Sequence, residues 1–390
     1  MPKNICGKCH HIYDSPLAGK CPNCNSPTGQ TFDFQNDDTF LNESIPKILE
    51  ERKEFGLEGL VKGLNCIIIN TEPEKHRAAV EELLKYTGFQ FKYTYEWNQV
   101  LTSVLSCKNS PDLLIQSRKL ETNPFRIYNN GKKIHNLPNT RLETFVFATD
   151  HLDNYVKKQK ARGISFLTDE ILNTSNYSFI QSKPTPYMGI SYGFIEWKDP
   201  THDYYSDEAS ELNWNLEKPS QNYLKNIGRL DHTATRVRAK DRDAAIIEFM
   251  KYTNYNFDFA VYVKHLNSIT SVARLSATDF AMVFTSGITA FENITKSGPT
   301  EGFIYNYGTR THHMAFDTTN IEDTFSELQN NKMDFLIDLV GSREEGLKQT
   351  FSAQSPNTML VNEYIHRYDD FDGFFTKSNV TDLTKSTEKQ

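Results

Sequence analysis

One pattern of hydrophobic and polar positions occurs twice in the chain, 166 residues apart. The segment from Gly63 contains LNCIIIN followed by LLKYTGFQF, and the segment from Arg229 contains LDHTATR followed by FMKYTNYNF. In each copy an apolar stretch predicts a β-strand, and a helix is predicted after it. In the later copy Ala245, Ile246 and Phe249 recur at helical spacing. Further strands are predicted after each helix.

A second match pairs LETFVFATDHLDNYV, from Leu142, with RTHHMAFDTTNIEDTF, from Arg310. Both segments follow the order strand, short turn, helix, strand. The body of the chain is therefore predicted to contain four related units, two in each half. Units of this kind bury their apolar faces only by pairing, which predicts an α+β fold of paired βαβββ units forming curled mixed sheets with outer helices.

The two halves differ in chemistry where they align. Cys66 stands opposite His232, and Thr144 stands opposite His313. The later half therefore combines two imidazoles with the carboxylate of Glu363, whereas the earlier half lacks both histidines. This difference indicates one active half and one half retained for structure.

The same comparison suggests domain limits. Glu196, in YGFIEW, is the candidate counterpart of Glu363, although insertions blur that part of the alignment. We expect an N-terminal non-catalytic domain over residues 60–200 and a C-terminal catalytic domain over residues 225–385.

Four cysteines precede these domains. CGKC and CPNC, with Cys6, Cys9, Cys21 and Cys24, are two Cys-x2-Cys pairs separated by eleven residues. Two such pairs complete a tetrahedral thiolate site with no open position, which predicts a structural zinc in a zinc-ribbon-like module over residues 1–30. Rubredoxin-like iron and a redox-active cysteine pair are the alternatives.

Composition narrows the possible partners. The chain has 390 residues, 38% of them hydrophobic, and a net charge of -7. The negative charge argues against a nucleic-acid partner, which usually requires a basic surface. No apolar run approaches the roughly 18 residues that span a membrane, and the start of the sequence has no signal-peptide core. We therefore expect a cytoplasmic protein that acts on a small molecule.

His232, His313 and Glu363 are the candidate metal ligands. Two imidazoles and one carboxylate suit Fe(II) and leave coordination positions open, whereas zinc with three protein ligands and a water would indicate hydrolysis. Glu363 lies in the apolar run MLVNEYI, where a carboxylate is costly unless it is paired or metal-bound. His312 adjoins His313, but neighbouring side chains of a regular strand point to opposite faces, so we expect only one to be a ligand.

Four short motifs carry a family resemblance. LDHTATRV (230–237), HHMAF (312–316), GLKQTF (346–351) and NEYIHR (362–367) occur in the order and at about the spacing found in 4-hydroxyphenylpyruvate dioxygenase. The chain resembles that family, within the vicinal-oxygen-chelate superfamily, over roughly residues 60–385.

The resemblance implies roles for individual residues. It makes His232, His313 and Glu363 the iron ligands. It matches Gln349 to a glutamine that contacts the bound ligand, and Phe351 to a phenylalanine that packs on the substrate ring.

Four other positions are matched less directly. Ser271 corresponds to a polar position near the substrate's ring end, and Phe374 or Phe375 is expected on a C-terminal helix that closes over the site. His312 stands where the family usually has glutamine. It is either a pocket or supporting residue or a surface histidine.

The activity implied by the resemblance is that of a non-haem Fe(II) dioxygenase of aromatic amino acid catabolism. The substrates would be an aryl 2-oxo acid and O2, and oxidative decarboxylation with hydroxylation would give a homogentisate-type product. The family tends to form homo-oligomers, which makes a homo-oligomer possible here.

Alternatives to this activity stay open. They are a hydroxymandelate-synthase-like reaction, an extradiol ring-cleaving dioxygenase with His312 or His366 as acid-base catalyst, and a non-enzymatic vicinal-oxygen-chelate binding protein. DFAMVFTSGI lacks the family's Pro-Ile-Asn-Glu run, GFFTKSN departs from its C-terminal pattern, and the cysteine module is additional. These departures concern the substrate more than the metal.

Overall fold

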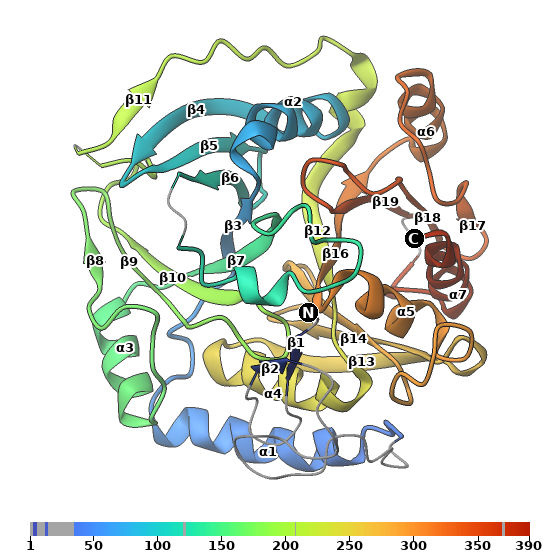
Figure 1. Ribbon diagram of the computed structural model, residues 1–390, viewed down its shortest axis with the longest axis horizontal. Coiled ribbons are helices and arrows are strands. Elements are labelled where there is room, and N and C mark those ends of the chain that lie inside the picture. The colour runs from blue at the N-terminus through green and yellow to red at the C-terminus, as the bar shows by residue number, and fades with distance from the viewer. Residues whose placement is uncertain (1–2, 6–11, 15–34, 120–121, 207, 369–370) are drawn as a thin grey trace.

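The computed structural model describes residues 3–5, 12–14, 35–119, 122–206, 208–368 and 371–390. Two mixed β-sheets, one from each half of the chain, form most of the molecule (Figure 1). The cysteines of the predicted zinc ribbon, Cys6, Cys9, Cys21 and Cys24, lie outside the described residues, so that module stays a prediction. In the first 14 residues of the sequence, the structure describes two short antiparallel strands, β1 (Lys3–Ile5) and β2 (Ile12–Asp14).

The first sheet has the strand order β11-β4-β5-β6-β3-β7-β10-β9-β8. Its strands are β3 (Leu64–Asn70), β4 (Gln90–Trp97), β5 (Val100–Ser106), β6 (Asp112–Arg118), β7 (Arg141–Ala148), β8 (Leu172–Asn173), β9 (Tyr177–Gln181), β10 (Ser191–Trp197) and β11 (Ser210–Leu212). The helices of this half are α2 (His76–Tyr86) and α3 (Leu152–Ala161).

The second sheet has the order β13-β14-β15-β12-β16-β19-β18-β17. Its strands are β12 (Ile227–Arg236), β13 (Asn256–Val263), β14 (Ser268–Arg274), β15 (Ala281–Ser286), β16 (Arg310–Thr318), β17 (Val340–Ser342), β18 (Leu347–Phe351) and β19 (Val361–Arg367). Its helices are α4 (Arg242–Tyr252), α5 (Gly298–Tyr307), α6 (Ile321–Asn330) and α7 (Lys377–Ser386). Short 3-10 helices are η1 (Pro73–Lys75), η2 (Arg126–Tyr128), η3 (Asn222–Asn226), η4 (Ala239–Asp241), η5 (Lys264–Leu266) and η6 (Thr387–Lys389).

Each half consists of two βαβββ units. In every unit the first strand pairs in parallel with the last, as β12 does with β15 and β16 with β19. The two units of a half then join through their first strands, which pair antiparallel: β3 with β7, and β12 with β16. The predicted α+β fold of tandem paired units is therefore confirmed, whereas the limits 60–200 and 225–385 stay predictions.

The predicted helix of the third unit is α4, and its apolar face is buried as expected. Ala245, Ile246 and Phe249 are fully buried. The Phe249 ring lies 5.9 Å from that of Phe147 on β7 and 5.6 Å from that of Tyr192 on β10. A helix of the later half thus packs on strands of the earlier half, and the two halves share one core.

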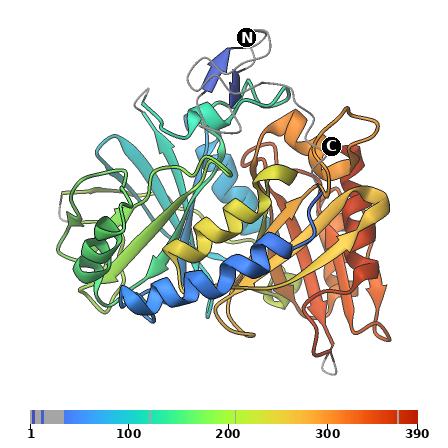
Figure 2. The same cartoon turned by 90° about the horizontal axis from the view of Figure 1, so that it is seen from below.

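A helix outside the repeats reinforces this contact. α1 (Thr39–Glu54) runs beside α4 (Figure 2). Near its C-terminus the buried guanidinium of Arg52 donates to the carbonyl oxygens of Met250, at 2.8 Å, and of Tyr255. These carbonyls lie at and just beyond the end of α4, where backbone acceptors have no partner within the helix.

Among the described helices, none has the length and apolar character needed to cross a membrane.

Candidate metal centre

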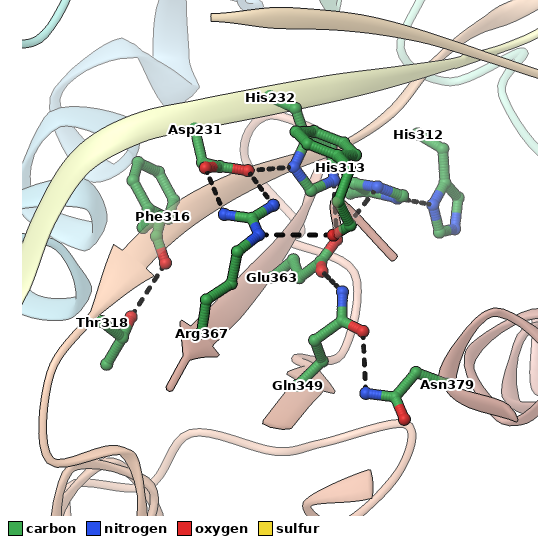
Figure 3. A network of polar contacts seen from close by, with 11 residues as sticks. Asp231, His232, His312, His313, Phe316, Thr318, Gln349, Glu363, Arg367 and Asn379 are labelled. Carbon is green, nitrogen blue, oxygen red and sulfur yellow. Dashed lines mark hydrogen bonds and ion pairs between the residues drawn. The ribbon is translucent and has the colours of Figure 1, made fainter. Parts of the chain in front are cut away.

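The pairing register of three central strands brings the candidate ligands together. His232 on β12 pairs with Ala315 on β16, and Ala315 pairs with Glu363 on β19. His313 precedes Ala315 by two residues and therefore points to the same face of the sheet. The small side chain of Ala315 leaves space between its neighbours, so two imidazoles and a carboxylate converge on one point (Figure 3).

The distances within this set fit a single ion. Nε2 of His232 and Nε2 of His313 each lie 3.2 Å from the same oxygen of Glu363. One ligand atom from each residue lies within 4.8 Å of the others, and all three residues are buried. Adjacent ligands at about 2.1 Å from an ion are separated by roughly 3.0 Å, close to the two shorter separations. His232 Nε2 is buried without a well-directed hydrogen bond among the described residues, as expected of a ligand atom.

Asp231 sets the orientation of the first imidazole. Its carboxylate accepts a hydrogen bond from Nδ1 of His232 at 2.7 Å, and Arg367 binds both oxygens of that carboxylate, at 2.7 and 3.0 Å. Nε2 is therefore the His232 nitrogen that faces the centre. Burial lowers the pKa of His232, but Glu363 and Asp231 outweigh it and raise this pKa to about 9. Without a metal, His232 is an imidazolium held between two carboxylates.

A β-bulge changes the expected geometry of the adjacent histidines. His313 pairs with Ala234 and Thr311 pairs with Thr235, so His312 has no cross-strand partner. The bulge turns His312 toward the same cavity as His313. The expectation of opposite faces, which assumed a regular strand, is therefore wrong here.

His312 supports His313 through a directed hydrogen-bond chain. The side-chain oxygen of Gln390 accepts from Nε2 of His312 at 2.8 Å, which leaves Nδ1 of His312 as an acceptor. That atom lies 2.8 Å from Nδ1 of His313, which donates to it. Burial holds the pKa of both histidines well below the ordinary value, so both are neutral. Nε2 of His313, which faces Glu363, is consequently unprotonated. His312 is buried, so its interpretation as a surface histidine is wrong.

Gln349 and Phe351, both on β18, line the cavity beside the candidate ligands, and their contacts with a substrate stay predictions. The Gln349 side-chain amide donates to the Glu363 oxygen that faces away from the histidines. It accepts in turn from Asn379 of α7, at 3.0 Å. The ring of Phe351 lies 4.7 Å from that of His313. These contacts fix the carboxylate and cover one imidazole.

A small cavity of about 40 Å³ adjoins the centre. Phe375 lines it, and its ring lies 5.1 Å from that of His232, while the ring of Phe374 lies 5.5 Å from that of His232. Both phenylalanines precede α7 rather than lie on it, so the expected helical position is wrong. α7 itself contributes Val380 and Leu383 to the cavity wall.

Ser271 does not lie in the cavity. Its hydroxyl accepts a hydrogen bond at 2.9 Å from Arg242, on the first turn of α4, and the neighbouring Thr270 faces the cavity instead. Arg236 also lines the cavity and was not predicted from the sequence. The period-two alternation of β12, which places residues 232, 234 and 236 on one face, was the signal available for it.

The earlier half has a different set at the equivalent positions. In the later half, Ala315 pairs with His232 on one side and with Glu363 on the other. In the earlier half, Val146 pairs in the same way with Cys66 and with Gly193. Gly193 is therefore the counterpart of Glu363, and the candidate assignment of Glu196 is corrected.

Comparison with known proteins supports this fold. No protein-family model matches the sequence, and no curated protein matches it. Among solved structures, the chain is similar to a triple mutant of 4-hydroxymandelate synthase from Streptomyces coelicolor. The TM-score is 0.63 with 13% identity, over 84% of this chain and 98% of that chain. It is also similar to a xylose isomerase-like TIM barrel/4-hydroxyphenylpyruvate dioxygenase fusion protein, with a TM-score of 0.59 and 12% identity, over 85% of this chain and 53% of that chain.

At these identities the similarity establishes architecture. The chain has the tandem vicinal-oxygen-chelate fold of 4-hydroxyphenylpyruvate dioxygenase-like proteins. Because one fold serves many reactions, function must be argued from the site.

Metal affinity should rise with pH. A divalent ion must displace the His232 proton below a pKa of about 9, so affinity should increase roughly tenfold per pH unit between about pH 7 and 9. Calorimetry with Co(II) measures this affinity at each pH. The protein used carries serine in place of Cys6, Cys9, Cys21 and Cys24. An affinity that stays constant over this interval would contradict the arrangement.

The support from His312 should be measurable separately from ligation. His312→Ala should weaken metal binding roughly 10- to 100-fold, because His313 loses the acceptor that orients it. His366→Ala is the matched control, since that ring bonds the carbonyl of Thr318 away from the centre. Equal affinities for the wild type and His312→Ala would show that the hydrogen-bond chain has no supporting role.

Proposed function

We propose that the protein is a non-haem Fe(II) dioxygenase that oxidatively decarboxylates an aryl 2-oxo acid and hydroxylates it. The observation that carries this proposal is the convergence of His232, His313 and Glu363 on one side of a point that adjoins a cavity. Two imidazoles and a carboxylate on one face suit Fe(II) and leave the opposite face for substrate and O2. The names of the structural neighbours are consistent with this class of reaction.

Bound Fe(II) would supply adjacent coordination positions for the 2-oxo acid and O2. The chain's own residues orient the ligands: Asp231 holds His232, His312 holds His313, and Gln349 holds Glu363. Gln349 already bonds both Glu363 and Asn379, so we assign it to positioning the carboxylate in addition to any contact with substrate.

The cavity must enlarge before an aryl acid can bind. About 40 Å³ holds little more than one water molecule at liquid density, whereas ligand pockets usually measure roughly 300 to 1,000 Å³. Phe375 and the α7 residues Val380 and Leu383 form one wall of the cavity. We propose that this wall moves outward for substrate and returns to exclude water during the reaction.

The alternatives differ in what they require from the site. A hydroxymandelate-type product requires the same centre, so the product is part of the test. An extradiol enzyme needs a free acid-base group near the metal. His312 is instead bonded to His313 and Gln390, and His366 to the backbone of Thr318.

A structural zinc at the four cysteines remains our second metal proposal.

Oxygen consumption tests the proposal. Protein purified and loaded with Fe(II) under anaerobic conditions should consume O2 and release CO2 in equal amounts with phenylpyruvate-type 2-oxo acids. His313→Ala should reduce both to background by removing a ligand, while His366→Ala should retain them. Uptake with catechol alone would favour ring cleavage, and no uptake with any of these compounds would favour a binding protein.

A further inference from the structure

We propose that the substrate carries a second negative charge at the end remote from the metal, and that Arg236 binds it. This inference rests on the proposed function of the metal site and specifies its substrate class. Arg236 is the last residue of β12 and faces the same cavity as His313. It follows His232 by four residues, so their Cα atoms lie about 13 Å apart along the strand.

The guanidinium of Arg236 is buried with few partners. The residue is 4% exposed, and Nη1 donates to the carbonyl of Pro299 at 3.2 Å. Nε is buried with no acceptor in the described part of the chain, and the guanidinium carbon lies 4.7 Å from the ring centre of Phe303. Among the described residues, no carboxylate forms an ion pair with it. A buried charge without a counter-ion is unfavourable, so an anionic ligand would satisfy it.

A second buried arginine lies opposite Arg236 on the neighbouring strand. This cross-strand partner is Arg310, which is fully buried and donates to the carbonyl of Thr140 at 2.7 Å. Nε and Nη1 of Arg310 have no acceptor among the described residues. Burial and the nearby charge of Arg141 together lower the pKa of Arg310 to about 9.

These features favour a carboxylate as the remote group. A guanidinium donates two parallel hydrogen bonds to a carboxylate, a geometry that a neutral phenol does not offer. Thr270, Thr285 and Thr300 line the same cavity and add hydroxyl donors. The substrate class is therefore a 2-oxo acid with a second carboxylate at its far end.

Binding to the Fe(II)-loaded protein without O2 tests this assignment. Calorimetry should show 4-carboxyphenylpyruvate binding roughly 10- to 100-fold tighter than phenylpyruvate. Arg236→Gln should remove that preference, and Arg236→Lys should restore part of it. The control is Arg229→Gln on the same strand. The Arg229 guanidinium donates to the exposed backbone carbonyl of Thr278. Circular dichroism verifies the fold of each variant.

Equal binding of both acids by the wild type, or a preference that survives in Arg236→Gln, would overturn the assignment. O2 uptake distinguishes this from failure of the proposed function. Uptake with phenylpyruvate but no dependence on Arg236 would leave the dioxygenase and remove the anion site. Arg236-dependent binding without uptake of O2 would support the anion site and contradict the proposed dioxygenase activity.

A different observation supports a second site, in the earlier half. We infer that this half binds an uncharged aromatic molecule in a cavity of about 230 Å³. The cavity lies at the position equivalent to the metal centre, since it is lined by Cys66 and Val146, the counterparts of His232 and Ala315. None of the described residues that line it is charged. Burial also raises the pKa of the Cys66 thiol, which is therefore neutral.

The lining identifies the ligand chemistry. Tyr95, Tyr177 and Phe179 present aromatic surface, which suits a planar apolar ring. Trp97 also lines the cavity, and its indole N–H is buried with no acceptor among the described residues. A ligand with one hydrogen-bond acceptor, such as a ketone oxygen, would satisfy this donor.

Acetophenone and ethylbenzene, which differ in the carbonyl oxygen, are suitable probes. Calorimetry on the metal-free chain should show acetophenone binding roughly 5- to 10-fold tighter. Trp97→Phe should abolish this difference, and Val146→Phe, which fills the cavity, should abolish binding of both. Absence of binding up to the solubility limit, or binding unchanged in a folded Val146→Phe protein, would overturn the inference.

Discussion

The pairing register of β12, β16 and β19 is the constraint on which the candidate centre depends. Successive residues of β16 alternate between the two faces of the sheet. His313 faces the cavity and Ala315 lies on the same face beneath the candidate ligands, whereas Met314 and Phe316 are fully buried in the core. A slip of one residue would turn the apolar side chains toward the cavity and His313 away from it. The apolar packing on one face of the sheet thus determines the metal chemistry on the other.

Each candidate ligand is then held by a different kind of neighbour. His232 is held by the residue before it in the chain, His313 by a bulged residue of its own strand, and Glu363 by a glutamine on the adjacent strand. These partners are directed at the ligand atoms that face away from the centre. The remaining nitrogen and oxygen atoms are therefore preorganised toward one point, which lowers the reorganisation needed when an ion binds.

Duplication explains why one half differs from the other. The same bulge occurs in both halves, because Glu143 lies between the paired residues Leu142 and Thr144 as His312 lies between Thr311 and His313. In the earlier half the bulged Glu143 pairs with Arg118, so that position forms an ion pair instead of supporting a metal ligand. Gly193 replaces the carboxylate of Glu363, and the ring of Phe179 lies against it. The scaffold is common to both halves, and the side chains at equivalent positions determine what each half binds.

Much of this arrangement was predictable from periodicity and internal repetition. The duplicated pattern predicted four βαβββ units, and motif order selected the three residues that the structure brings together. The bulge at His312 was not predictable, because it depends on register between β12 and β16 rather than on local sequence. Ser271 was misplaced for a related reason: a short motif match does not show which face of β14 a residue occupies. The Gly193 correspondence likewise required observed strand pairing.

The most direct measurement is the crystal structure of the chain loaded anaerobically with Fe(II), using anomalous scattering to locate iron. The account predicts an iron peak bounded by Nε2 of His232, Nε2 of His313 and one carboxylate oxygen of Glu363. Iron bound elsewhere, with no iron between these three side chains, would contradict it.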